Sequence, residues 1–212
     1  MNIYLIRHGR QDSPLCNVDV SLSPEGARQS KLLGLRLLNY HIDELYSSHF
    51  KRAVETAEIV NDYTKVNHSI RENICEISFG DMEGLDDKTL KEQYKDFYTE
   101  QKKLDSDIPY PGGECGEDVY NRAIITINEI IRSKHSNVAV ITHGGVIRAL
   151  LTKVLGLDMS QKLLFGISLE NTSITQLVYD ERVKRFYLER FNDYAHLESE
   201  PLLLRKNWLG KS

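Results

Sequence analysis

The sequence has few of the features that would mark a secreted, membrane-bound or metal-dependent protein. No apolar run approaches the roughly 20 residues that a transmembrane helix needs, and the first residues lack a basic segment before a long apolar stretch. We therefore predict neither a membrane span nor a signal peptide. The three cysteines, Cys16, Cys75 and Cys115, are odd in number and widely spaced. They form no CxxC pair, which favours free thiols in a reducing cytoplasm.

The balance of charge excludes further classes. Across 212 residues the net charge is −4, so bulk electrostatics give no reason to expect nucleic acid or an anionic membrane as a partner. Any affinity for phosphate must come from a local cluster of cations. The acids, histidines and cysteines show no clustered metal-ligand spacing, and we predict neither a metal nor a cofactor.

Hydrophobic spacing predicts strands that alternate with helices, and hence an α/β fold. We expect a three-layer α/β/α sandwich with a mostly parallel sheet, one late antiparallel strand and a small cap insertion. Residues 1–198 would form a single domain, with the cap at about 81–112 and a C-terminal tail at 199–212. The expected strands are 2–6, 43–47, 138–141, 173–179 and 185–191, and the expected helices are 24–38, 51–62, 89–103, 117–134 and 146–155.

Two predicted strands end in a histidine that a glycine follows. One gives Arg7-His8-Gly9 and the other His143-Gly144-Gly145. Ligands of open α/β sheets bind beyond the carboxyl ends of the strands, so the two imidazoles converge if these strands are neighbours. Gly144 also opens a predicted helix, whose first N–H groups suit an anion.

Two arginines accompany these histidines. Arg7 precedes His8, and Arg52 opens the helix after the second strand. Guanidinium groups match phosphate oxygens bidentately and stay charged, and phosphoryl transfer depends mainly on positioning and charge stabilisation. A carboxylic acid beside the pocket must still protonate the leaving oxygen. Glu76, Asp81 and Glu83 are the candidates.

Seven segments of the sequence, including those with His8, Arg52, Glu76 and His143, resemble in their order the histidine phosphatase superfamily, also called phosphoglycerate mutase-like. The resemblance runs from about residue 2 to residue 198. The matching segments are Arg7-His8-Gly9, Leu22-Ser23-Pro24-Glu25-Gly26, the run from Ser48 to Ala57 that contains Arg52, the run from Glu76 to Gly84, Gly113-Glu114-Cys115, His143-Gly144-Gly145, and the run from Phe191 to Leu197.

The resemblance implies a role for each matching residue. His8 takes the phosphoryl group, while Arg7, Arg52, His143 and Gly144 hold its oxygens. Glu76 protonates the leaving group and then deprotonates water, in preference to Asp81 and Glu83.

The sequence departs from the family pattern at the substrate-facing rim. Arg10 and Gln11 stand where the family usually has an acid or Gln and then Thr or Ser. Pro14 stands where an Asn often contacts phosphate, with Asn17 three residues further on, and Cys115 replaces a Ser. These changes bear on which substrate is bound, and they leave open whether Asn17 contacts phosphate.

The implied activity is a phosphatase of small phosphate monoesters. The main alternative is a phosphomutase, which in this family typically carries a longer insertion before the Gly-Glu-Ser motif and has His-Gly-Asn. About 30 residues and Gly145 stand there instead, which favours the phosphatase. A non-catalytic phosphoester-binding module would need a broken site. The substrate (ribazole phosphate, a phosphorylated sugar or a glycerate, by analogy) stays open, as does docking of the apolar tail on its own domain or on a second copy in a homodimer.

Overall fold

The computed structural model describes residues 1–205 and contains one six-stranded sheet. Its strands lie in the order β3-β2-β4-β1-β5-β6. The first four are parallel to one another, and β5 is antiparallel to both of its neighbours. The strands are β1 (Asn2–Arg7), β2 (Glu44–Ser47), β3 (Asn67–Ile70), β4 (Asn137–Thr142), β5 (Ile174–Asp180) and β6 (Arg185–Asp193).

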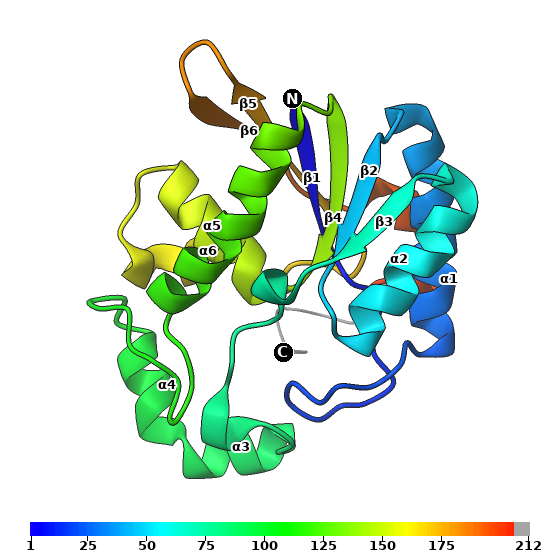
Figure 1. Cartoon of the computed structure of the whole chain (residues 1–212). Helices are drawn as coiled ribbons and strands as arrows, with labels where there is room; N and C mark the ends of the chain where they lie inside the picture. The colour runs from blue at the N-terminus through cyan, green and yellow to red at the C-terminus, as the bar shows by residue number, and fades with distance from the viewer. Residues whose placement is uncertain (206–212) are drawn as a thin grey trace.

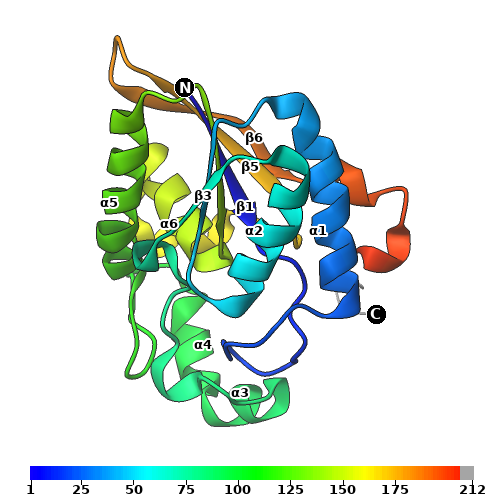
Figure 2. The ribbon, with the colours of Figure 1, turned by 45° about the vertical axis from the view of Figure 1, so that its right-hand side comes forward.

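Helices cover both faces of the sheet (Figures 1 and 2). On one face α1 (Pro24–Leu37) and α2 (Lys51–Thr64) pack against alternate residues of β1 such as Ile6. On the other, α5 (Gly116–Ser133) and α6 (Gly144–Val154) pack against the intervening residues such as Leu5. Because successive side chains of a strand point to opposite faces, β1 contributes to two hydrophobic cores. This arrangement confirms the predicted α/β/α sandwich and its mostly parallel sheet.

Local sequence signals explain where the helices begin. The side chain of Ser23 accepts a hydrogen bond from the N–H of Gly26 at 3.1 Å, and Pro24 occupies the first turn of α1, as expected for an N-cap followed by proline. At the start of α5, the N–H of Cys115 donates to the carboxylate of Asp118 at 3.0 Å. This capping box starts the helix one residue before the predicted position.

Two elements differ from the sequence-based expectation. The edge strand β3 was not predicted, because its sequence Asn-His-Ser-Ile is mostly polar and lacks an apolar face. The single helix expected over 89–103 is wrong: α3 (Asp87–Gln93) and α4 (Lys95–Gln101) are separated at Tyr94, whose φ of −113° is not helical. Six short 3₁₀ helices complete the description: Leu38–Tyr40, Glu72–Ile74, Gly80–Met82, Met159–Leu164, Ala195–Leu197 and Pro201–Leu203.

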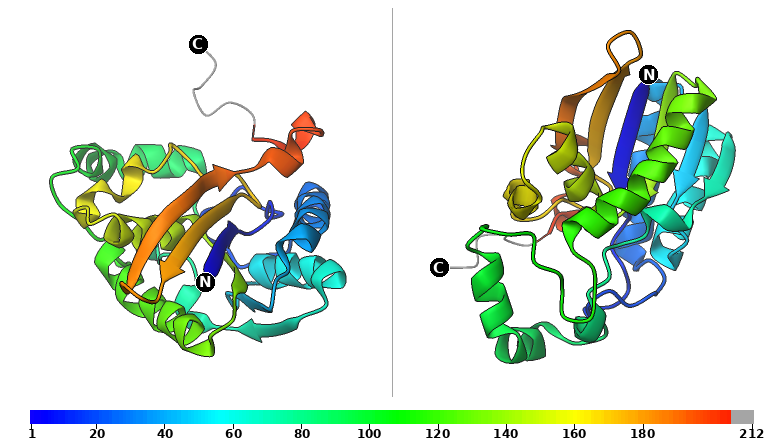
Figure 3. Two further views of the ribbon diagram at one scale, coloured as in Figure 1. Left: turned by 90° about the horizontal axis from the view of Figure 1, so that it is seen from above. Right: turned by 60° about the vertical axis from the view of Figure 1, so that its left-hand side comes forward.

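Two segments extend from the sandwich toward the carboxyl ends of β1 and β4. Helices α3 and α4 lie beyond that edge of the sheet, apart from both helix layers (Figures 1 and 3). The chain after β6 runs beside α1 (Figure 3). Of the apolar stretch noted in the tail, Lys206, Asn207 and Trp208 lie outside the described residues. Within residues 1–205 no helix has the length and apolar character needed to cross a membrane.

Candidate active site

The two histidines lie side by side where β1 and β4 end. The strands pair in register, with Arg7 opposite Thr142, and the N–H of His8 donates to the carbonyl of Thr142 at 2.9 Å. The ring centroids of His8 and His143 are 4.9 Å apart. The expected convergence of the two imidazoles therefore follows from the pairing of β1 with β4.

Hydrogen bonds fix which nitrogen of His8 carries the proton. Nδ1 lies 2.7 Å from the carbonyl oxygen of Gly9, which can only accept, so Nδ1 is protonated. Nε2 accepts from Nε of Arg52 at 3.2 Å, so it carries a lone pair and no proton, and it must give up this hydrogen bond before it can form a bond to a ligand. Burial, with the nearby charges of Arg52 and Arg7, holds the pKa of His8 well below the ordinary histidine value. His8 is therefore a neutral imidazole that is protonated on Nδ1 and unprotonated on Nε2.

Arg52 is held against His8 by the loop that follows β1. Its side chain is only 2% exposed, and besides His8 it donates to the carbonyl of Val18 and to Oδ1 of Asn17, both at 2.9 Å. Asn17 in turn donates to Glu83 at 3.0 Å. In this structure Asn17 thus positions Arg52, a role that the sequence did not reveal.

Two buried polar atoms near His8 lack a partner within residues 1–205. Nε2 of His143 lies 2.9 Å from the hydroxyl of Ser48, but its Nδ1 makes no hydrogen bond. Arg7 donates from Nη1 to the carbonyl of Leu169, but its Nε makes none. A buried polar group left unpaired costs about 1–3 kcal/mol, and the oxygens of a bound phosphoryl group would supply the missing acceptors. Burial, followed by the neighbouring His8, also holds the pKa of His143 well below its ordinary value.

Glu76 lies against the first turn of α6. Its Oε1 accepts from the N–H groups of Ile77 and Gly145, both at 2.9 Å. A Cβ at Gly145 would stand 2.5 Å from that oxygen, so a side chain here would displace the Glu76 carboxylate from its present position. The N-terminus of α6 was expected to offer N–H groups to a phosphate, but here the Gly145 N–H binds the Glu76 carboxylate.

Arg122 of α5 holds the backbone around Glu76. It donates to the carbonyls of Asn73 and Cys75 at 2.9 and 2.8 Å, and to that of Glu76 at 2.9 Å. It also forms an ion pair with Glu114 at 2.8 Å, and Glu114 accepts from the N–H of Ser78. Sequence reasoning missed Arg122. The signal that could have indicated it was Glu114, which belongs to one of the matching motifs. A half-buried carboxylate needs a cationic partner, and Arg122 is that partner.

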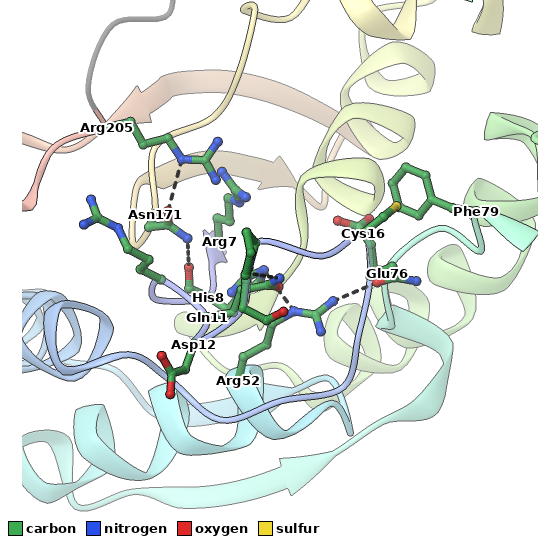
Figure 4. A pocket seen from close by; sticks show the side chains of 14 residues that line it. Arg7, His8, Gln11, Asp12, Cys16, Arg52, Glu76, Phe79, Asn171 and Arg205 are labelled. Carbon is green, nitrogen blue, oxygen red and sulfur yellow. Dashed lines mark hydrogen bonds between the residues drawn. The ribbon is translucent and has the colours of Figure 1, made fainter. Parts of the chain in front are cut away.

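These groups surround a cavity of about 630 Å³ (Figure 4). Four of the predicted residues line it: Arg7, His8, Arg52 and Glu76. His143 is fully buried behind His8, and Gly144 lines an adjoining cavity of about 190 Å³.

Neither Asp81 nor Glu83 belongs to the lining of the main cavity, which favours Glu76 among the three acids. The lining residues that were not singled out from the sequence include Asn171, whose amide donates to the carbonyl of His8 at 2.9 Å, and Arg205. No group of three or more potential metal-binding acids, histidines or cysteines occurs in the part of the chain that the structure describes.

The family model of the histidine phosphatase superfamily (branch 1) matches residues 3–194. The chain belongs to this superfamily. It is 33% identical over 221 aligned positions to a probable phosphatase of Schizosaccharomyces pombe, covering 94% of this chain and 97% of that protein. It is also 31% identical over 160 positions to a 2,3-bisphosphoglycerate-dependent phosphoglycerate mutase of Cytophaga hutchinsonii, covering 70% and 75%. Relatives of both activities therefore exist.

Solved structures share the fold along most of the chain. The mycobacterial glucosyl-3-phosphoglycerate phosphatase, in complex with VO3, superposes with a TM-score of 0.82, covering 91% of this chain and 99% of that one at 23% identity. The sheet and helix layers described above are therefore those of the superfamily.

Proposed function

We propose that this chain is a phosphatase that hydrolyses small phosphate monoesters through a phosphohistidine on His8. The observation that carries the proposal is the state of His8: a neutral ring whose Nε2 lone pair lies among Arg52, Arg7 and His143 on the wall of a cavity. A nucleophile with fixed cations around the group it attacks is what phosphoryl transfer requires.

The reaction has two steps. In the first, Nε2 of His8 attacks phosphorus, the bond to the ester oxygen breaks, and Glu76 gives that oxygen a proton. In the second, Glu76 takes a proton from water, the water oxygen attacks phosphorus, and the N–P bond breaks to release orthophosphate. Arg7, Arg52 and His143 stabilise the charge on the transferred oxygens in both steps, and Glu76 acts first as acid and then as base.

The phosphomutase remains the second candidate, since one relative carries that name. Gly145 is the observation that separates the two. The typical mutase residue here is Asn, and any Cβ would collide with the Glu76 carboxylate as it lies in this chain. The Glu76–Gly145 contact therefore supports the phosphatase.

The deciding experiment combines product analysis with trapping of the intermediate. The purified protein should release orthophosphate from p-nitrophenyl phosphate without any bisphosphoglycerate, and a quenched reaction should contain an acid-labile, alkali-stable phosphoenzyme. Activity that persists in EDTA would support a metal-free reaction. Phosphate transfer between glycerates with negligible hydrolysis would instead establish the mutase.

A further inference from the structure

The chain after the 3₁₀ helix Ala195–Leu197 is held against other segments of the protein and reaches the cavity at Arg205. We call residues 198–205 the C-terminal strap. Glu200 forms an ion pair with Arg28 of α1. The carbonyl of Leu203 accepts from Gln29 at 2.9 Å and from Arg10 at 2.7 Å. Leu203 itself is only 7% exposed. The strap is thus held by side chains of α1 and of the loop that follows His8.

This anchoring brings Arg205 to the cavity that holds the nucleophile. Its Nη1 donates to the hydroxyl of Ser168 at 2.9 Å and its Nε to Oδ1 of Asn171 at 3.1 Å. The buried Glu170 receives its backbone N–H at 3.1 Å and lies 3.9 Å from its Nε. In Figure 4 the guanidinium of Arg205 points toward Arg7. These contacts hold Arg205 in place, and the residue also lines the cavity.

Two guanidinium groups in one partly buried cavity repel each other. After burial, the charge of Arg205 is the largest influence that lowers the pKa of Arg7. Burial lowers the pKa of Arg205 to about 10, so it stays charged at neutral pH. An anion bound to Arg205 relieves the repulsion, and its binding free energy offsets the cost of keeping the charge of Arg205 there.

The position of Arg205 indicates which anion it meets. The amide of Asn171 separates Arg205 from the nucleophile loop, because its Oδ1 accepts from Arg205 and its Nδ2 donates to the carbonyl of His8. Arg52 contacts Nε2 of His8 directly, whereas Arg205 is linked through Asn171 to the backbone carbonyl of that residue. The cavity of about 630 Å³ also has room for a leaving group well beyond the phosphoryl group.

We propose that Arg205 is a specificity-determining residue that binds a second anionic group, on the leaving portion of the substrate. This inference rests on the proposed phosphatase activity. It names the preferred substrate class as phosphate monoesters that carry a further negative charge, such as a carboxylate, at a distance from the transferred phosphate. A guanidinium matches a carboxylate bidentately.

The test compares substrates that differ only in that charge. Phenyl phosphate is the uncharged reference, and 3- and 4-carboxyphenyl phosphate carry the added carboxylate. The full-length protein and its Arg205→Gln and Arg205→Lys variants are assayed for kcat and KM on all three esters. Arg182→Gln is the matched control, because that arginine is 89% exposed at the β5–β6 turn and lies outside the cavity.

We expect wild type to prefer at least one carboxyphenyl ester. Arg205→Gln should raise KM for that ester about tenfold or more, as loss of a charge-assisted hydrogen bond predicts, with kcat and the phenyl phosphate kinetics nearly unchanged. The KM of Arg205→Lys for that ester should lie between those of wild type and Arg205→Gln, and the kinetics of Arg182→Gln should match those of wild type.

The outcomes separate this inference from the proposed function. Equal losses on all three esters would mean that Arg205 binds the transferred phosphate or only supports the fold, and would overturn the second-anion proposal. Unchanged selectivity in Arg205→Gln would overturn it as well. Failure of the wild type to hydrolyse any of the three esters or to form a phosphoenzyme would instead count against the phosphatase itself.

Discussion

The wall and the rim of the cavity are built in different ways. The wall residues His8 and Arg52 are 3% and 2% exposed, and His143 behind them is 0% exposed. They follow or adjoin strand ends, and strand pairing places them. The rim residues Arg10 and Arg205 are only partly buried and come from a loop and from the strap. On the proposed mechanism the wall carries out the reaction, whereas the rim is the part of the cavity that meets the leaving portion of the substrate.

Removal of the nucleophile should have the largest effect. We expect His8→Ala to lower kcat on p-nitrophenyl phosphate by about 10⁴-fold or more and to abolish the phosphoenzyme, because no other group replaces the Nε2 lone pair. His135→Ala, at a half-buried histidine outside the cavity, is the control and should behave as wild type. A His8→Ala protein that still turns over would reject the assignment of the wall.

Replacement of Glu76, the proposed acid, should slow the reaction to an extent that depends on the leaving group. Glu76→Gln preserves an oxygen for the N–H groups of Ile77 and Gly145 but has no proton to give. In single-turnover reactions, which isolate the first step, we expect about 10²–10³-fold slower release of an alkyl alcohol such as glycerol. Release of p-nitrophenolate, which hardly needs a proton, should slow much less. Equal slowing for both leaving groups would contradict the acid role.

The pH dependence of stability can test whether His196 anchors the segment that leads to the rim residue Arg205. His196, just before the strap, lies 3.1 Å from the hydroxyl of Thr172 and 3.3 Å from Arg36, and burial and Arg36 lower its pKa to about 4. In the unfolded chain the pKa of this histidine is near 6.5. As the pH falls, His196 is therefore protonated in the unfolded chain before it is protonated in the folded protein. His196 therefore contributes stability that is present above about pH 6.5 and is lost as the pH falls toward 4.

Urea unfolding at pH 7 and pH 5 measures this contribution. Wild type should lose about 2 kcal/mol more than His196→Gln between the two values, since each unit of pKa shift corresponds to about 1.4 kcal/mol. His8 and His143 have lowered pKa values in both proteins, so their contribution cancels in the difference. If the two proteins lose the same free energy, the segment before the strap is not anchored through a neutral His196.

The sequence predicts the wall better than the rim for a physical reason. Regular apolar spacing and the glycines after His8 and His143 are local signals, and strand pairing converts them into a shared location. The strap instead depends on contacts over long separations, such as Arg10 with Leu203 and Arg205 with Asn171. No local spacing encodes those pairs. The same holds for Arg122, whose four carbonyl and carboxylate partners come from other segments.

Asn17 connects the two regions and should give the smallest effect. It belongs to the loop after Arg10 and Gln11, yet its side chain accepts from Arg52. In Asn17→Ala, Arg52 keeps its bonds to His8 and Val18, so we expect kcat/KM to fall only severalfold, about the loss of one hydrogen bond. Since the proposed mechanism assigns Arg52 to the transferred phosphate, this loss should be the same for phenyl phosphate and for its carboxylated analogues, unlike that of Arg205→Gln. Asn39→Ala, at an exposed asparagine outside the cavity, is the control. A loss in Asn17→Ala that depends on the charge of the leaving group would place Asn17 with the rim, and the division between wall and rim would have to be redrawn around it.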